Sequence, residues 1–380
     1  MSTRLALILR PVPPRLSALP ANGLRGYYYR RLWDGWSMAQ RTLAKALTAA
    51  RYGAAARRGA LAAWRLGFTP TMFDEVEARR QPGAALAAFL DQDERKGVHA
   101  LLNPGALPFD ANPLKNKARF AAFCAAQGLP APRPGPGADG LIVKPRYGSK
   151  GRGVRRLERR DGQWVANDGE IIAALSMSRW VAAQEAGGMI VQELLRTNPA
   201  LRSISPGALP TLRITTCLNE KGVPEVADVA LRLSLGDDRA ADNFNADNLV
   251  CGVDRASGRL GPALRRIAGG FAELVAHPAT RAPIAGEQLA ALDAAMALAC
   301  RAHAPLAPGF TVIGWDIGLA ESGPALIEGN WNPGYNVMQL VHGRGLGEMR
   351  LGELYRHHLD RLPAATWHAA APVEWAQRRL

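Results

Sequence analysis

The sequence has little cysteine and no long apolar run, and these absences narrow the class of protein. Its four cysteines, Cys124, Cys217, Cys251 and Cys300, are far apart, and none forms a CxxC pair. This spacing argues against a local zinc site or a disulfide framework and favours buried free thiols. The sequence holds no stretch that reaches the ~18–20 apolar residues of a membrane-spanning helix, and no low-complexity tract or repeat. The composition is that of an ordinary globular protein.

A secretory leader is not expected at the start of the sequence. The apolar segment from Leu5 to Leu9 is short and ends at Arg10 and Pro11, whereas a signal peptide needs a longer apolar region and a cleavage site. We therefore expect a cytoplasmic protein. Its 380 residues suffice for two or three packed units.

Acidic residues are scarce in the first 65 positions. Twelve Lys and Arg residues stand there against Asp34 alone, so this segment carries +11 of the net charge of +14. The segment also contains Tyr27, Tyr28, Tyr29 and three tryptophans. We favour a solvated helical face that packs its aromatic side chains on the body of the protein. The main alternative is contact with the inner membrane surface; nucleic acid is the less favoured partner.

The Pro/Gly-rich stretch 130–139 separates a helical half from a half rich in strands. Apolar patterning predicts helices at 24–66, 72–102, 114–127, 169–185, 286–303 and 348–362. It predicts strands at 141–143, 154–157, 163–166, 189–195, 211–218, 224–233, 311–319 and 325–329. The result is an α+β chain. We divide it into a basic aromatic segment (1–66), a helical subdomain (67–138), a small lobe (139–196), a large lobe (197–355) and a tail (356–380).

A glycine-rich loop runs from Lys144 to Gly153. Successive glycines let backbone N–H groups turn toward a phosphate, and neighbouring hydroxyl and cationic side chains add donors and charge. Walker and Rossmann loops open a helix, but here strand-type residues precede and follow the loop, as Val154 and Trp164 show. We favour phosphate binding over an ordinary turn, and a phosphate contact for Lys144 over a surface position. The loop residues concerned are Gly148, Ser149, Lys150, Gly151 and Gly153.

A second motif combines Asp316 with Glu328 and Asn330 on two predicted strands. Side chains two apart in a strand share a face, and a symmetric hairpin centred near Ser322 places Asp316 opposite Glu328. Two facing carboxylates repel unless a cation lies between them. Oxygen ligands of these types suit Mg²⁺. The alternative is a buried acid paired with a distant arginine, such as Arg213.

These two motifs, in this order, resemble the ATP-grasp superfamily, and within it the sugar-transfer-associated group that is related to α-L-glutamate ligases. The resemblance runs from about residue 67 to residue 350. Besides the two motifs it rests on short segments: Asn116 to Phe120, Gln127 to Pro130, Ile190 to Leu195, Leu209 to Arg213, Asp242 to Phe244, His277-Pro278 and Pro283 to Gly286. The resemblance implies two α/β lobes that clasp ATP between antiparallel sheets, behind an N-terminal helical region.

The resemblance also implies an activity. ATP and Mg²⁺ would activate a substrate carboxylate as an acyl phosphate with release of ADP, and an amine or another nucleophile would then attack. Lys117, Lys144 and the loop would bind phosphate, and Arg213 would stabilise the transition state. The same resemblance assigns the adenine site to Gln192, Glu193 and Leu195, and the metal site to Asp316, Glu328 and Asn330.

Two departures from the group stand in the sequence: Asn116 replaces an aspartate before Lys117, and Asp247-Asn248 replaces paired glycines. The second departure puts the transfer of a relative's substrate in doubt. The alternatives are an ATP-grasp phosphotransferase or AMP-forming enzyme, or a non-catalytic ATP-binding protein docked through its basic segment. The sequence has no GxSxG motif, and we expect His357 and His358 at the surface.

Overall fold

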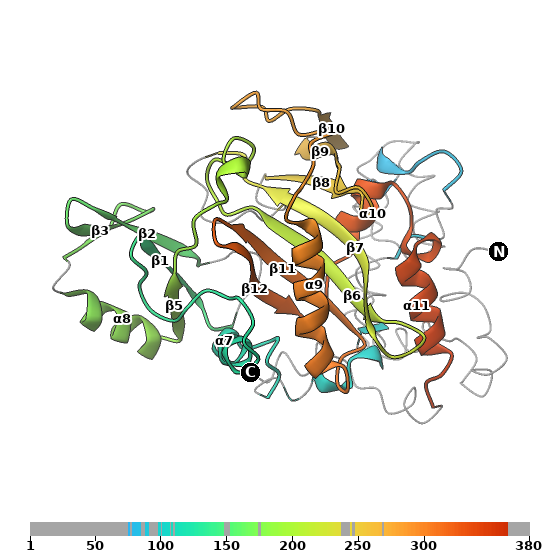
Figure 1. Ribbon diagram of the computed structural model, residues 1–380, viewed down its shortest axis with the longest axis horizontal. Coiled ribbons are helices and arrows are strands. Elements are labelled where there is room, and N and C mark those ends of the chain that lie inside the picture. The colour runs from blue at the N-terminus through green and yellow to red at the C-terminus, as the bar shows by residue number, and fades with distance from the viewer. Residues whose placement is uncertain are drawn as a thin grey trace, which may run out of the picture.

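The computed structural model (Figure 1) describes residues 75–363, apart from 77, 85–87, 91–97, 100, 107, 109–110, 148–152, 174–175, 237–243, 245–247 and 268–269. The basic N-terminal segment, the predicted helix at 24–66 and most of the tail lie outside these residues. In the described part, the backbone forms two antiparallel sheets with helices packed against them. None of the helices described is long and apolar enough to cross a membrane.

The smaller sheet has five strands in the order β4-β3-β2-β1-β5. They are β1 (Gly140–Pro145), β2 (Arg155–Arg160), β3 (Gln163–Ala166), β4 (Ile171–Ile172) and β5 (Met189–Glu193). Asp161 and Gly162 join β2 to β3 with positive φ angles of 48° and 77°, the backbone that a two-residue hairpin turn requires. Helix α8 (Met177–Ala186) covers this sheet and closes a small core around Leu141, Leu157 and Val191.

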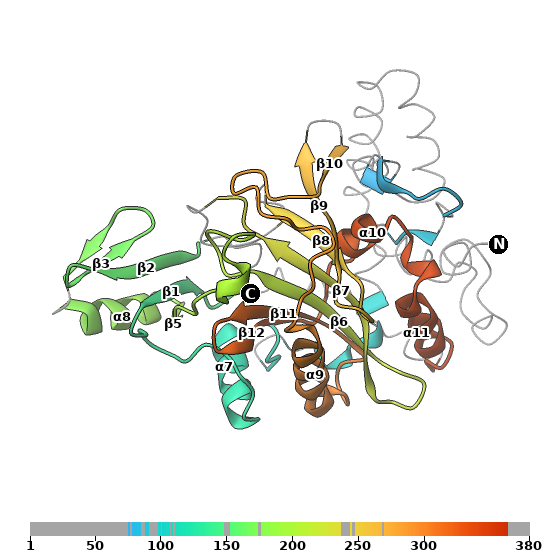
Figure 2. The same cartoon turned by 45° about the horizontal axis from the view of Figure 1, so that its top comes forward.

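The larger sheet has seven strands in the order β10-β9-β8-β7-β6-β11-β12. They are β6 (Thr211–Leu218), β7 (Pro224–Leu233), β8 (Leu249–Val253), β9 (Leu260–Ile267), β10 (Gly270–Leu274), β11 (Val312–Ala320) and β12 (Gly323–Asn330). Strand β11 is buried along its whole length. The smaller sheet lies beside the β11–β12 region in both views (Figures 1 and 2).

Each face of the larger sheet has its own hydrophobic core. Alternate residues of β11, such as Ile313 and Trp315, pack on one face with α9 (Leu292–His303) and α7 (Lys117–Ala126). Val312 belongs to the second core, which the residues of α10 (Asn336–His342) and α11 (Arg350–Leu359) help to form. Short 3-10 turns complete the described chain at Pro104–Ala106, Pro199–Leu201, Ala304–Leu306 and Leu346–Glu348.

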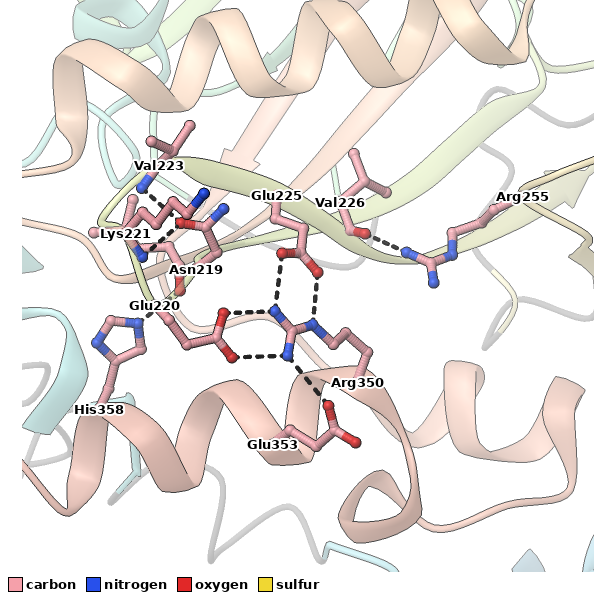
Figure 3. A network of polar contacts seen from close by, with 11 residues as sticks. Asn219, Glu220, Lys221, Val223, Glu225, Val226, Arg255, Arg350, Glu353 and His358 are labelled. Atoms are coloured by element: carbon pink, nitrogen blue, oxygen red, sulfur yellow. Dashed lines mark hydrogen bonds and ion pairs between the residues drawn. The ribbon is translucent and has the colours of Figure 1, made fainter.

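An ion-pair network fixes α11 to the turn between β6 and β7 (Figure 3). Arg350 pairs with Glu220 at 2.7 Å, with Glu225 at 2.7 Å and with Glu353 at 3.2 Å. Hydrogen bonds from Arg350 lower the pKa of Glu220 to about 2. His358, which we expected at the surface, is half-buried because its Nε2 donates to the Leu218 carbonyl at 2.6 Å.

Two helix predictions were wrong at their starts. The helix predicted at 169–185 begins only at Met177, because Gly169 adopts a φ of +88° and Ile171–Ile172 pair with β3. The helix predicted at 286–303 begins at Leu292, because the preceding residues hydrogen-bond to the β8–β9 connection, as Leu289 does to Gly258. Strands β8, β9 and β10 were not predicted, since glycine, proline and arginine interrupt their apolar pattern.

Candidate functional site

Lys144 lies at the seam between the two sheets. It is the last residue but one of β1 and is only 7% exposed. The pKa of Lys144 is lowered to about 8, chiefly by burial and also by the nearby charge of Lys117, although Glu328 and Asp316 act to raise it. These influences show that the smaller sheet, α7 and the β11–β12 hairpin bring their charged groups together. The structure thus unites four residues that the sequence predicted for one site.

The start of α7 is joined to the glycine-rich loop. Asn116 caps the helix, because its Oδ1 accepts from the backbone N–H groups of Ala118 at 3.0 Å and Arg119 at 3.3 Å. Its Nδ2 donates to the Tyr147 hydroxyl at 3.0 Å. The Lys117 N–H donates to the Arg146 carbonyl at 3.2 Å. An asparagine therefore performs the capping role of an aspartate here and also binds the loop.

Most of the predicted phosphate loop lies outside the described residues. Gly148, Ser149, Lys150 and Gly151 fall in this part, so their role stays a prediction. Gly153 is described and adopts a φ of +70°, a conformation that glycine reaches without a steric penalty. Lys144 and Gly153 hence mark the two ends of the loop.

A β-bulge sets the register of the β11–β12 hairpin. Asp316 is paired with Glu328, as predicted, but the next residue, Ile317, is paired with Leu326. The turn is therefore centred between Glu321 and Ser322, not on Ser322, and Ile327 is the extra residue. The bulge lets Leu326 point into the core with Ile317, while Glu328 shares the opposite face with Asp316.

Asp316 lies between two arginines. Arg213 Nε is 2.8 Å from Asp316 Oδ1, and Arg232 Nη2 is 2.9 Å from Asp316 Oδ2. Arg232 also donates to the Thr211 hydroxyl at 2.7 and 3.0 Å. The arginine pairing that we weighed as the alternative to a metal site is thus present, and a second arginine adds to it.

Sequence reasoning missed Arg232 and Lys115. Arg232 reaches the site because its strand places it opposite Thr211, and this pairing needs a register that only the fold supplies. Lys115 is two residues before Lys117, and Glu328 acts to raise its pKa although burial and Lys117 lower it overall. The presence of two lysines in the first turn of the helix predicted at 114–127 was the only sequence signal for Lys115.

Asn330 and Glu328 complete the polar face of the hairpin. They share one face of β12, opposite Gly314 and Asp316 of β11. The Nδ2 atom of Asn330 is buried and has no hydrogen-bond partner among the described residues. A buried amide without a partner is unfavourable unless something else binds there.

The predicted adenine segment is the edge of the smaller sheet. Gln192 is buried, and its Nε2 donates to the Pro132 carbonyl at 3.3 Å. The Glu193 carboxylate pairs with Arg133 at 2.7 Å. Leu195 follows directly after β5. The backbone of this edge is also paired, because the Glu193 N–H donates to the Arg133 carbonyl at 2.9 Å and the Val191 carbonyl accepts from the Gly135 N–H at 3.0 Å. The adenine role of this segment stays a prediction.

Comparison with known proteins identifies the fold and then the family. Two antiparallel sheets with charged residues gathered at their seam define an ATP-grasp fold. Residues 135–353 match the sugar-transfer associated ATP-grasp family, and the chain belongs to this family. The resemblance inferred from the motifs is confirmed. No match was found among curated proteins.

Solved structures match the chain at low similarity. The chain is 14% identical to an L-amino acid ligase from Bacillus licheniformis, with a TM-score of 0.39, over 74% of this chain and 57% of that one. It is 11% identical to D-Alanine-D-Alanine Ligase from Helicobacter pylori, with a TM-score of 0.36, over 67% of this chain and 61% of that one. The match thus spans less than two thirds of either solved chain.

Proposed function

We propose that the protein is a Mg²⁺- and ATP-dependent ligase that activates a carboxylate as an acyl phosphate, releases ADP and transfers the acyl group to an amine or another nucleophile. The observation that carries this proposal is the electrostatic coupling of buried Lys144 with Asp316 and Glu328 across the seam. A buried lysine beside acids and other cations suits an anionic ligand that brings its own metal.

The residues present fit a magnesium ion. Asp316, Glu328 and Asn330 bring oxygen atoms to one face of two paired strands, which is the ligand type that Mg²⁺ prefers. The Asp316 oxygens also pair with Arg213 and Arg232, so this carboxylate would be shared between the ion and the two arginines. The buried Nδ2 of Asn330 has no partner among the described residues; as a donor it suits a phosphate oxygen, whereas Oδ1 is the atom that the side chain would offer to the ion. When bound, the ion would neutralise charge on the transferring phosphoryl group.

Other residues of the site would bind the phosphates and adenine of ATP and stabilise the transition state. Lys117 and Lys144 would hold phosphate oxygens, together with Gly148, Ser149, Lys150, Gly151 and Gly153 of the loop. Arg213 lies beside Asp316, where its planar guanidinium would stabilise negative charge that develops on the acyl phosphate. The segment that contains Gln192, Glu193 and Leu195 would receive adenine.

The experiment that tests the nucleotide site is thermal unfolding with increasing Mg-ATP. A ligand that binds only the folded state raises the melting temperature as its concentration rises. We expect this rise for the wild type and its loss in Lys144→Ala and Glu328→Gln. Lys221→Ala, in the exposed β6–β7 turn, is the matched control and should behave as the wild type. A wild type that does not respond to Mg-ATP would contradict the proposal.

The nucleotide product separates the proposal from its alternatives. Wild-type protein with a pool of carboxylates and amines should release ADP and phosphate in a carboxylate-dependent reaction, and AMP would identify the AMP-forming relative instead. The role of the basic N-terminal segment is tested by removing residues 1–65. Loss of binding to anionic vesicles with unchanged turnover would make the segment a membrane contact.

A further inference from the structure

A histidine–aspartate pair lies on the same face of the larger sheet as the candidate site. His342 is the last residue of α10, and its Nε2 is 2.8 Å from Oδ1 of Asp228 on β7. Helix α10 packs across β7 and β8 on this face. Neither residue belongs to the motifs of the ATP site. The pair is therefore a second set of titratable groups on the face that carries Asp316.

The strand register places the pair close to Arg213. Asp228 is paired with Thr215 of β6, and Arg213 is two residues farther along β6 on the same face. At ~3.4 Å per residue and ~4.8 Å between strands, the Cα atoms of Asp228 and Arg213 are about 8 Å apart. The residue opposite Arg213 is Ala230, so the nearest position toward His342 carries only a small side chain. The His342 ring packs against Gly252 of β8, the residue opposite Ala230, so small residues occupy both positions between Arg213 and the ring.

The geometry fixes the imidazole through one nitrogen atom, and the other makes no hydrogen bond to the described residues. The Asp228 side chain is 6% exposed, and its Oδ1 also accepts from the Val229 N–H at 2.9 Å. The His342 side chain is 30% exposed. The acid is buried and held by two hydrogen bonds, while the ring is partly exposed to solvent. With Nε2 directed at Asp228, Nδ1 is the atom that can meet a substrate.

The surrounding charges set the protonation of His342. Burial and the cations Arg255 and Arg344 act to lower its pKa, but the hydrogen bond and charge of Asp228 outweigh them and raise it. The C-terminal end of α10 adds a partial negative charge that also favours the protonated ring. An imidazole held by a carboxylate in this way is the arrangement of a general base.

We propose that His342, oriented by Asp228, accepts the proton of the nucleophile that attacks the activated carboxylate. The proposal rests on the ligase function proposed above. The nucleophile's lone pair forms the bond to the carbonyl carbon, the bond from that carbon to the phosphate oxygen breaks, and inorganic phosphate leaves with the electron pair. The proton passes from the nucleophile to Nδ1 of His342 and then to solvent. The site thereby gains an acceptor side over β7 and β8, two strands or more from Asp316 on β11.

The test separates the two half-reactions. A pool of amino acids, dicarboxylates and sugar acids supplies the carboxylate, and hydroxylamine traps the acyl phosphate as a hydroxamate. Hydroxylamine is a neutral nucleophile near pH 7 and needs no base from the protein. In His342→Gln we expect hydroxamate formation within about twofold of the wild type, and amine-dependent turnover reduced by about 10²–10⁴-fold. His357→Gln, on α11, is the matched control and should keep both rates.

Two further variants keep the proposal falsifiable if glutamine disturbs the fold. Free imidazole should restore amine-dependent turnover to His342→Ala, which a purely structural histidine would not allow. Asp228→Asn should move the acidic limb of the pH–rate profile to lower pH, because the charge that raises the histidine pKa is lost.

The outcomes distinguish the two proposals. If the wild type forms no hydroxamate with any member of the pool, the ligase function and the role of His342 both fail. If the wild type forms hydroxamate and His342→Gln loses both rates equally, or keeps both, the ligase function stands and the role of His342 is overturned.

Discussion

The guanidinium of Arg232 lies 2.9 Å from the Asp316 carboxylate, on the other carboxylate oxygen from the one that Arg213 approaches. Asp316 therefore shares its single negative charge between two arginines, so that these three groups together carry a net charge of +1, which suits an anionic substrate. The hydrogen bond from Arg232 to the Thr211 hydroxyl also holds the Arg232 guanidinium in place at the edge of the site.

Replacement of Arg232 by methionine should reduce stability. The change removes the hydrogen bonds to Thr211 and one partner of a buried acid, which we expect to cost about 1–3 kcal/mol of unfolding free energy. Urea unfolding measures the loss. Arg202→Met removes an exposed pair with Glu321 at 3.4 Å and should cost only about 0–1 kcal/mol. Equal effects of the two variants would show that the Arg232 contacts contribute no more than a surface pair.

Binding of Mg-ATP should be linked to proton uptake by Lys144. In the free protein its pKa is lowered to about 8, so near pH 8.5 a large fraction of the side chain is neutral. Phosphate oxygens favour the charged form, raise the pKa and draw a proton from solution. Calorimetry in buffers of different ionisation enthalpy should detect uptake at pH 8.5 and less at pH 6.5, where the lysine is already charged.

The control for this linkage is Lys144→Arg, whose side chain is charged at both pH values. It should bind without the additional uptake at pH 8.5. The affinity of the wild type should also fall as the pH rises above 8. Proton uptake that is the same at both pH values in the wild type would contradict the assignment of Lys144 to the phosphate site.

Gly314 is expected to tolerate no side chain. A Cβ atom there would lie 2.5 Å from the Cβ of Pro333, so Gly314→Ala must displace the segment that follows Asn330. Such overpacking typically costs about 1–3 kcal/mol, and we expect weaker stabilisation by Mg-ATP as well. Gly261→Ala in β9 meets only a backbone oxygen at 3.6 Å and serves as control. A Gly314→Ala protein as stable as this control would show that Pro333 moves without cost.

Acid should destabilise the protein through His303. This residue is fully buried, with Nε2 donating to the Phe310 carbonyl and Nδ1 bonded to the Thr216 hydroxyl, both at 2.8 Å. Burial lowers its pKa to about 4, so between pH 6.5 and 4 the unfolded chain binds a proton that the folded chain does not. Stability attributable to His303 is therefore complete above pH 6.5 and is lost as the pH falls.

Urea unfolding at pH 7 and pH 5 measures this effect. The wild type should lose about 2 kcal/mol through this group, and His303→Gln should lose correspondingly less between the same two pH values, whatever its stability at pH 7. An identical pH dependence in the two proteins would assign the acid sensitivity to other groups.

The fold could be predicted from the sequence where local patterns agree with the final pairing. Strands β6 and β7 have the predicted bounds, because their apolar residues flank the turn at Lys221 and Gly222. Strands β8 to β10 could not be predicted, since their burial depends on neighbours distant in sequence. The same limit applies to the site: Asp316 and Glu328 carry a visible motif, whereas Arg232 reaches the site only through the sheet register.

The bulge at Ile327 has a consequence for how this hairpin can change over evolution or in the laboratory. On the turn side of the bulge, β12 is aligned to bury Leu326, and beyond it the strand is aligned to present Glu328. One inserted residue separates the two alignments. The turn at Glu321 and Ser322 can therefore be redesigned for stability without a change in the geometry of the acidic pair, and the ligand end can be altered for specificity while the core stays the same. The turn end and the ligand end of the hairpin can therefore vary independently, with Ile327 as the boundary between them.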